Sequence, residues 1–321
     1  MARPPLLVIV GPTAVGKSAV GLEIAERLNG EIVSADSMQV YRGMDIGTAK
    51  ATEDERARVR HHLLDVADPG EIFSVARYQE LAQAAIEGIT ARGALAVMVG
   101  GTGLYVDAVV RGFLFPFEGR NDDIRQRLEQ EANVVGSCTL HGRLREVDPR
   151  AAERIHPNDR RRIIRALEVH EVTGVPITEL QRRHKGQSRY DTRQFGLTLP
   201  RDVLRERIDR RVDEMMSAGL LEEVRELVGG GYAPCFTAMQ AIGYKELAAY
   251  LEGRTSLEEA VHTIKNETRK YAKRQMTWFR KNRDIEWVDI SEYDEPEQVA
   301  DEIITRLGEW PRGVDTGGDP A

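Results

Sequence analysis

The sequence predicts an α/β fold, namely a P-loop-containing parallel sheet with flanking helices and an inserted helical subdomain. Three observations lead to this prediction. An apolar run at Leu6–Val10 precedes a glycine-rich turn and an amphipathic segment over Lys17–Leu28, which together indicate a strand, a turn and a helix. Strand-like and helix-like segments then alternate over about the first 110 residues. Beyond Pro116 the pattern becomes typical of helices without buried strands.

The first part of the chain contains a predicted βαβ unit. In the helix over Lys17–Leu28, apolar side chains recur every four residues, and Asn29–Gly30 ends the helix. Glu31–Ala35 follows as the second strand, and the right-handed crossover makes the pair parallel. A further helix over Ser74–Arg92, with Ser74 as its N-cap, leads into a strand at Leu95–Val99.

The second part of the chain is predicted to be mostly helical. A short strand at Phe195–Leu199 returns the chain to the sheet, and two long helices follow over Arg201–Val228 and Leu257–Arg283. The helices expected before that strand are 122–132, 136–147, 149–155, 159–173 and 177–185.

The length of 321 residues fits two units, or one large domain with an insertion. We expect residues 1–115 to form the first part of the core and residues 116–190 to form the inserted subdomain. Residues 191–310 would return to the core with long helices, and residues 311–321, which are poor in apolar side chains, would form a disordered tail.

The composition excludes several classes of protein. With 41% hydrophobic and 30% charged residues, the chain is neither collagen-like, nor a disulfide scaffold, nor wholly disordered. No apolar run approaches the roughly 20 residues that a membrane-spanning helix needs, so no membrane contact is expected. Met1–Pro5 precedes the first strand without a long apolar h-region, so no secretory signal is expected. We therefore expect a cytoplasmic protein, acting as a monomer.

The charge is unevenly distributed. The net charge is −7, but the segment from His262 to Arg283 carries +7, which leaves −14 for the remainder. Aromatic side chains at Tyr271, Trp278 and Phe279 are interleaved with its basic residues, a composition suited to stacking on bases and contacting phosphates. Alternatively, this segment is a helix whose aromatic side chains face the core and whose charges face water.

The strongest motif is the P-loop pattern Gly11-Pro-Thr-Ala-Val-Gly16-Lys17-Ser18. Its glycines allow backbone amides to turn toward phosphate oxygens, and the start of the following helix adds a positive dipole end. Lys17 supplies a mobile positive charge, and Ser18 supplies a hydroxyl ligand for Mg²⁺. The alternative is a tight glycine turn that binds no ligand.

A carboxylate is predicted beside this loop. The strand at Leu95–Val99 ends in Gly100–Gly103 rather than in an acidic residue, whereas the second strand is followed by Asp36. Because the carboxyl ends of neighbouring parallel strands meet at one crevice, Asp36, Thr102 and the P-loop should lie together. The alternatives are that Asp36 is an ordinary cap or loop carboxylate and that the glycines only permit close packing.

An arginine cluster is predicted on the helix that follows Asp159. Arg160–Arg162 and Arg165 occupy its first turns, where Asp159 can act as the N-cap. These side chains could bind a phosphate or an RNA backbone. The alternative is an ordinary solvated start of a helix.

Six motifs in order along the chain resemble the tRNA dimethylallyltransferases, also called isopentenyl-diphosphate:tRNA transferases. The eukaryotic zinc-finger extension is absent, so the resemblance is to bacterial-type members. One departure is Ala51, where the family often has proline. The motifs are GPTAVGKS (11–18), SADSMQVYRGMDIGTAK (34–50), GGTGLY (100–105), HPNDRRRIIRALEVHEVTG (156–174), AIGYKE (241–246) and AKRQMTWFRK (272–281).

The resemblance implies an activity. A dimethylallyl group would pass from dimethylallyl diphosphate to N6 of adenosine 37, in tRNAs that read codons beginning with U, and diphosphate would be released. No phosphoryl group is transferred, so the P-loop would hold the diphosphate as a leaving group, with Mg²⁺ as cofactor. The implied partners are dimethylallyl diphosphate and the anticodon stem-loop of tRNA.

The resemblance also implies roles for residues. Asp36 would be the general base, with Thr102 and Lys17 also catalytic, and Ser18 would bind Mg²⁺. The implied diphosphate ligands are Gly11, Thr13, Ala14, Val15, Gly16, Lys17 and Ser18, with Arg207 or Arg211. The implied tRNA contacts are Asp36, Ser37, Met38, Gln39, Arg125, Arg161, Arg162, Ile163, Ile164, Arg165, Gln240, Ala241, Ile242, Gly243, Tyr244 and Lys245.

Two other functions compete with this interpretation. A P-loop kinase of nucleosides or small molecules would also combine a P-loop with an arginine-rich helical lid, and it would turn over ATP. A non-catalytic RNA-binding protein could retain a vestigial P-loop. The intact Lys17–Ser18 pair together with Asp36 argues against the second alternative.

Overall fold

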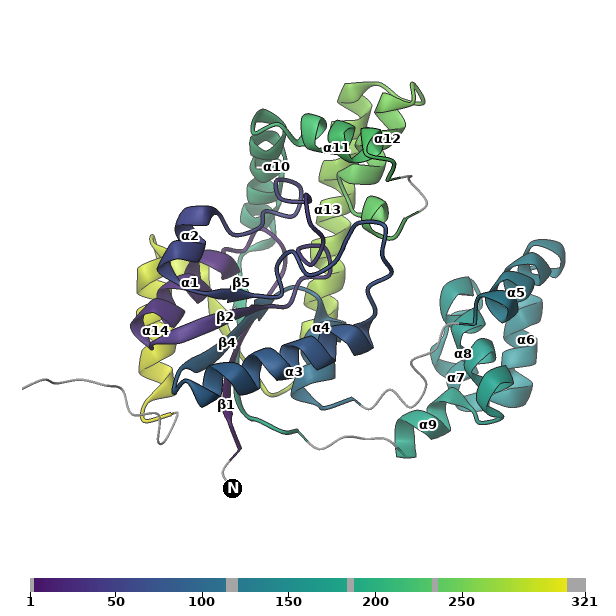
Figure 1. Ribbon diagram of the computed structural model, residues 1–321, viewed down its shortest axis with the longest axis horizontal. Coiled ribbons are helices and arrows are strands. Elements are labelled where there is room, and N and C mark those ends of the chain that lie inside the picture. Colours follow the sequence, from purple (N-terminus) through teal and green to yellow (C-terminus); the bar gives the residue numbers. More distant parts are fainter. Residues whose placement is uncertain (1–2, 114–120, 184–187, 233–235, 311–321) are drawn as a thin grey trace, which may run out of the picture. The chain divides into compact units, whose positions relative to one another are not determined.

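The computed structural model describes residues 3–113, 121–183, 188–232 and 236–310. The chain divides into two compact units, Met1–Val110 with Arg189–Ala321, and Arg111–Ser188 (Figure 1). The first unit contains the sheet, and the second is helical. The expected insertion at 116–190 covers nearly the same residues as the second unit, whereas the expected tail at 311–321 lies outside the described residues.

The first unit is built on a six-stranded sheet in the order β3-β2-β4-β1-β5-β6, in which every pairing is parallel. The predicted α/β class is confirmed. In the central strand, Leu6–Val10 is completely buried, as expected for a strand covered on both faces. The strands are β1 (Pro5–Val10), β2 (Gly30–Ser34), β3 (His61–His62), β4 (Leu95–Gly100), β5 (Asp191–Thr198) and β6 (Ile285–Asp289).

Helices cover both faces of the sheet (Figure 1). Alternate residues of β1 face opposite sides, so Leu7 packs with α1 (Lys17–Arg27) and α14 (Pro296–Leu307), while Leu6 packs with α3 (Val75–Ala91) and α4 (Gly103–Val110). The short helix α2 (Glu53–Arg58) starts with a capping box at Thr52. Two short 3₁₀ helices also occur, η1 (Ala238–Gln240) and η2 (Ile290–Glu292).

Four further helices of this unit lie together beside the sheet (Figure 1). They are α10 (Arg201–Ser217), α11 (Leu220–Gly229), α12 (Tyr244–Leu251) and α13 (Leu257–Phe279). The single helix expected over Arg201–Val228 is wrong, because α10 ends at Ser217 and a separate helix begins at Leu220. Gly219 has a φ of 101° there, a left-handed conformation that glycine adopts without steric cost.

In its described residues the second unit contains five helices. They pack around a core that includes Leu128, Leu144 and Leu167. The Asp159 carboxylate accepts a hydrogen bond from the Arg162 amide, which confirms the predicted cap. The helices are α5 (Asp122–Val135), α6 (Ser137–Val147), α7 (Pro149–Arg154), α8 (Arg160–Thr173) and α9 (Ile177–Arg183). In the described parts of both units, every helix is too short or too polar to cross a membrane.

Candidate active site

The P-loop connects β1 to α1. A Cβ atom on Gly11 would lie 2.6 Å from the carbonyl oxygen of Leu197, so only glycine fits beside β5 at this point. Gly16 opens α1 with a φ of 99°, and the helix start has no side-chain cap and no acidic residue in its first turn. The amides and the positive dipole end of α1 are therefore available to an anion.

Lys17 and Ser18 occupy the first two positions of α1, and both line a cavity. The Lys17 ammonium donates a hydrogen bond to the Pro12 carbonyl oxygen at 2.7 Å. Burial of the ammonium, together with the nearby positive charge of Arg211, lowers the pKa of Lys17 to about 7, although the negative charge of Asp36 opposes this shift. In the free protein, Lys17 therefore loses its proton near neutral pH. A bound anion would favour the protonated, positively charged form.

The ends of β2 and β4 are joined as predicted. The Thr102 amide donates to the Ala35 carbonyl oxygen at 3.0 Å, and the Ser37 amide donates to the Thr102 hydroxyl oxygen at 3.0 Å. A Cβ atom on Gly100 would lie 2.2 Å from the oxygen of Ala35, so the close packing proposed for these glycines is also real. Thr102 thus holds the backbone that carries Asp36.

Asp36 lies at the centre of the charged groups. Its carboxylate accepts a hydrogen bond from the Met38 amide at 2.8 Å. One of its oxygen atoms therefore stabilises the local turn. Its negative charge also acts on Lys17, Arg211 and Tyr271. Burial lowers the pKa of Arg211, and burial together with the Asp36 charge raises the pKa of Tyr271 to about 12. The carboxylate therefore faces two cations and a neutral phenol.

These groups line one cavity of about 1150 Å³ in the first unit. Both Arg207 and Arg211 line it, so both stay candidate ligands of an anion. The side chain of Val15 is completely buried and packs in the core under the P-loop, together with side chains of β1. The predicted residues that line the cavity are Thr13, Ala14, Gly16, Lys17, Ser18, Asp36, Met38, Gln39, Arg207, Arg211, Ala241, Ile242 and Gly243.

Gln275 is a residue of this site that the sequence analysis missed. Its side-chain oxygen accepts a hydrogen bond from the Thr13 amide at 2.8 Å, and its side-chain nitrogen donates to the Gly101 carbonyl oxygen at 3.0 Å. The residue is only 6% exposed. The Thr13 amide is thus already used, which leaves the amides from Ala14 onward for an anion. A glutamine within a basic helix gives no signal of this role.

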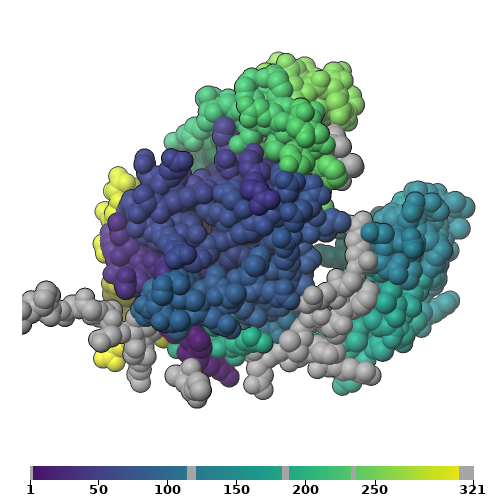
Figure 2. All heavy atoms as spheres, viewed as in Figure 1, coloured from purple at the N-terminus to yellow at the C-terminus, as the bar shows by residue number. Residues whose placement is uncertain are grey.

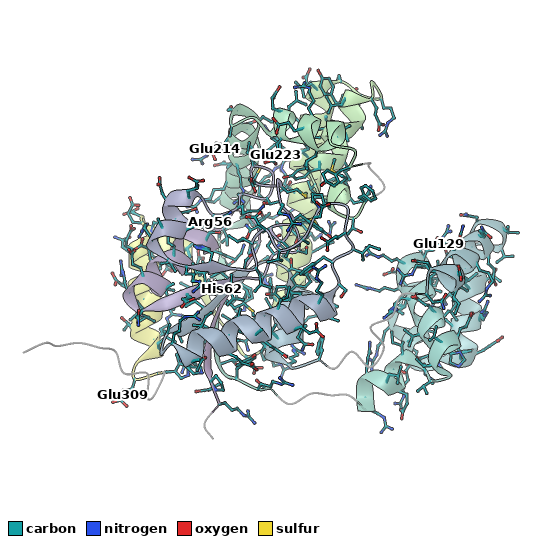
Figure 3. All side chains as sticks on the ribbon, in the orientation of Figure 1. Arg56, His62, Glu129, Glu214, Glu223 and Glu309 are labelled. Atoms are coloured by element: carbon teal, nitrogen blue, oxygen red, sulfur yellow. The ribbon has the colours of Figure 1, made fainter. Side chains whose placement is uncertain are left out.

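Glu223 of α11 shapes the loop that follows Asp36. Its carboxylate accepts hydrogen bonds from the amides of Asp45, Ile46 and Gly47 and from the Tyr244 hydroxyl. Figure 3 labels Glu223, and Figure 2 shows the surface of this loop against that of α11 and α12. No sequence pattern signals this role, because the partners of Glu223 are three backbone amides and one hydroxyl from other segments.

The segment 240–245 differs from its prediction as a stretch that contacts tRNA. Ile242 and Gly243 line the cavity, and Gln240 is exposed, but Tyr244 is completely buried. Its ring packs so close to Gly47 that a Cβ atom there would lie 2.5 Å away. Tyr244 therefore supports the cavity loop, and its side chain cannot be an RNA contact.

The predicted RNA-contacting residues of the second unit fall into three groups. Arg161 and Arg162 are exposed. Arg125 and Arg165 instead form ion pairs with Glu168, which is 0% exposed. Ile163 and Ile164 have side chains that belong to the core, so they could make the predicted tRNA contacts only through their backbone. They follow the apolar face of α8, whereas the arginines follow its polar face.

The aromatic side chains of the basic segment from His262 to Arg283 are divided between the core and the surface. Phe279 is buried, whereas Trp278 is 37% exposed and donates a hydrogen bond to Asp107. Some of its cations form ion pairs, with Lys265 bound to Asp213 and Arg269 bound to Asp209. The exposed cations after Tyr271 are Lys273 and Arg274 within α13 and Arg280, Lys281 and Arg283 just after its end.

Comparison with known proteins agrees with this geometry. The family model described as IPP transferase matches residues 39–282. A tRNA dimethylallyltransferase of Symbiobacterium thermophilum is 52% identical over 308 residues, covering 96% of each chain. That of Desulforudis audaxviator is 50% identical over 301 residues, covering 94% of this chain and 97% of the relative.

Two solved structures are similar over most of the chain. The tRNA isopentenylpyrophosphate transferase of Bacillus halodurans has a TM-score of 0.70 and 47% identity, covering 96% of this chain and 98% of that one. A eukaryotic dimethylallyltransferase acting on tRNA has a TM-score of 0.79 and 30% identity, covering 95% of this chain and 79% of that one. The chain therefore belongs to the IPP transferase family, the tRNA dimethylallyltransferases, and is a prenyltransferase.

Proposed function

We propose that this protein transfers a dimethylallyl group from dimethylallyl diphosphate to N6 of adenosine 37, in tRNAs that read codons beginning with U. The observation that carries the proposal is a single cavity that joins the uncapped start of α1 to Asp36. An anion site beside an accessible carboxylate suits a reaction in which a diphosphate leaves and a proton is removed.

In this proposal the diphosphate binds to the amides from Ala14 onward, with Lys17, Arg207 and Arg211 around it. The C1–O bond of the substrate breaks, and the electron pair leaves with the diphosphate. The amine N6 forms a bond to C1. Preorganised positive groups stabilise the charge that develops on the leaving oxygen, where water would have to reorient.

Asp36 would take the proton that N6 loses as the new bond forms. Its carboxylate is partly exposed to the cavity, and its backbone is held by the contact between Ser37 and Thr102. The adenine has to leave the anticodon stack to reach a carboxylate inside a cavity, as bases do in other enzymes that modify them. The proton of protonated Asp36 would pass to solvent after the product leaves.

The residues present also fit a magnesium ion. Mg²⁺ prefers oxygen ligands and is usually held by a few protein groups together with substrate phosphates. Ser18 is exposed and lines the cavity beside the P-loop, so its hydroxyl would hold the ion together with oxygens of the bound diphosphate. When bound, Mg²⁺ would neutralise part of the leaving-group charge.

The tRNA would be bound through exposed cations of both units, among them Arg161, Arg162 and Arg274. We propose that the protein acts as a monomer in the cytoplasm, where its tRNA substrate is found. Such binding would weaken as salt rises, because each neutralised phosphate releases counterions.

The direct test is incubation of the protein with unmodified tRNA, Mg²⁺ and labelled dimethylallyl diphosphate, with labelled ATP as the parallel substrate. The label of dimethylallyl diphosphate should enter tRNA at adenosine 37 and at no other nucleoside. Turnover of ATP without prenyl transfer would indicate a kinase. Binding of tRNA without either reaction would indicate a non-catalytic RNA-binding protein.

A further inference from the structure

One row of side chains on each of two helices changes from polar to apolar along the cavity. On α10, residues at four-residue spacing line it, namely Arg207, Arg211 and Met215, and on α13 the lining residues include Tyr271 and Ile264. Side chains four positions apart lie on the same face of a helix. Each helix therefore presents polar groups at one level of the cavity and an apolar group at another.

Two ion pairs fix how the helices are aligned. The Arg269 side chain donates to Asp209 at 2.9 Å, and the Lys265 ammonium lies 2.6 Å from the Asp213 carboxylate. The helices are therefore antiparallel. Arg207 is level with Tyr271, and Met215 is level with Ile264. On these two facing rows the side chains are polar at one end and apolar at the other, while Glu214, which also lines the cavity beside Met215, is exposed.

The apolar end is closed by residues from other segments. A Cβ atom on Gly219, just after α10, would lie 3.9 Å from the Ile46 side chain, and one on Gly243 would lie 3.6 Å from Leu220. Ile46, Leu220 and Ile242 all line the cavity. The bend between α10 and α11 therefore brings these side chains to the same end as Met215.

We propose that this apolar end binds the hydrocarbon part of the allylic diphosphate and that Met215 limits its length to five carbons. The inference rests on the proposed function. Four residues of helix, a rise of about 6 Å, separate Arg211 from Met215, and this distance is comparable with the length of a dimethylallyl group. A diphosphate at Lys17 and Arg211 would place C1 near Asp36 and direct the remaining carbons toward Met215.

The chemistry of this end favours the hydrocarbon over the adenine ring. The nitrogen atoms at the edges of adenine would lose hydrogen bonds to water, and burying polar groups without partners is costly. Met215, Ile242 and Ile264 have no hydrogen-bonding groups that could replace them. A dimethylallyl group has no such requirement, and its burial is favourable in proportion to its apolar area.

The test compares dimethylallyl diphosphate with geranyl diphosphate, whose chain has ten carbons, at saturating tRNA. For Met215→Ala we expect the ratio of kcat/KM for the longer to the shorter substrate to rise by ~10-fold or more, within the usual range for added carbons in an apolar pocket. The matched control is Met216→Ala, because Met216 is partly buried but does not line the cavity. It should leave the ratio unchanged.

A second variant and a binding measurement guard against loss of folding. Met215→Phe should raise KM for dimethylallyl diphosphate while leaving the Kd of tRNA unchanged. Competition of geranyl diphosphate with labelled dimethylallyl diphosphate reports the same preference without turnover. An unchanged chain-length ratio in folded Met215→Ala, or a change in tRNA affinity instead, would overturn the inference. Failure of the wild type to use dimethylallyl diphosphate would contradict the proposed function itself.

Discussion

In the sheet-containing unit the proposed reacting groups come from separate strand ends and meet in one cavity, whereas in the helical unit the proposed RNA contacts follow one helix. Asp36 and Lys17 are positioned by backbone contacts at the ends of β2 and β1. On α8, Arg165 is neutralised by the buried Glu168, which also pairs with Arg125 of α5, and the neighbouring isoleucines form the core. A motif at a strand end therefore indicates a position in space, but a run of charges on a helix does not indicate which of them are available.

The largest expected effect concerns Asp36. Asp36→Ala should lower kcat by ~10²- to 10⁴-fold, the range for a positioned general base, while tRNA affinity stays nearly intact. Single-turnover transfer and a tRNA binding titration measure the two quantities separately. A variant that kept half of the wild-type kcat would show that Asp36 is not the general base. The position of a residue at a strand end would then be no better a guide to function than a charge on a helix.

The core role of Ile163 predicts a change in stability rather than in RNA binding. Ile163→Ala should lower the free energy of unfolding by ~2–5 kcal/mol, because it leaves a cavity among buried side chains. Urea unfolding followed by circular dichroism measures this quantity. If stability is unchanged and tRNA affinity falls, the assignment of this side chain to the core is wrong.

Replacing Gln275 should weaken the binding of dimethylallyl diphosphate and leave the affinity for tRNA unchanged. Gln275→Met keeps the size of the side chain but removes its hydrogen bonds to the Thr13 amide and the Gly101 carbonyl. An unsatisfied buried group costs ~1–3 kcal/mol, so we expect KM for dimethylallyl diphosphate to rise by about tenfold. The Kd of tRNA is the control. An equal loss in both constants would mean that Gln275 only stabilises the fold.

The lowered pKa of Lys17 predicts a pH dependence. Below pH 7 the free protein already carries the ammonium that a diphosphate requires. As the pH rises through the pKa of about 7, the neutral amine has to take up a proton on binding, so KM for dimethylallyl diphosphate should increase. In Lys17→Met this dependence should disappear, which leaves only the titration of the diphosphate. Identical profiles for both proteins would exclude Lys17 as the titrating group.

The smallest effect is expected for the exposed arginines. Reversing the charge of Arg161 and Arg162 should weaken tRNA binding and reduce its salt dependence, by about 1 in the log–log slope for each lost phosphate contact. Affinity for dimethylallyl diphosphate should not change. Arg225→Glu is a matched control, because Arg225 is also an exposed helix arginine but lies outside the proposed RNA contacts. Equal losses in both proteins would show a general charge effect.

Local patterns were sufficient for much of this protein. The P-loop followed from its spacing of glycines, and the meeting of Asp36 with Thr102 followed from the geometry of parallel strands, because both depend on residues adjacent to a strand end. The cap at Asp159 could likewise be predicted, since a side chain and an amide three residues apart form it. These features need only a few neighbouring residues to be specified.

Tertiary structure decided the remainder, because it concerns partners far apart in sequence. Gln275 accepts a hydrogen bond from an amide 262 residues away, and Glu168 pairs with Arg125 of another helix. A single sequence contains no pattern that predicts these two contacts. The break at Gly219 was missed because the helical pattern continues on both sides of it. The sequence by itself therefore determined which chemistry the chain can support, whereas packing between distant segments determined which charges remain free and which side chains close the cavity.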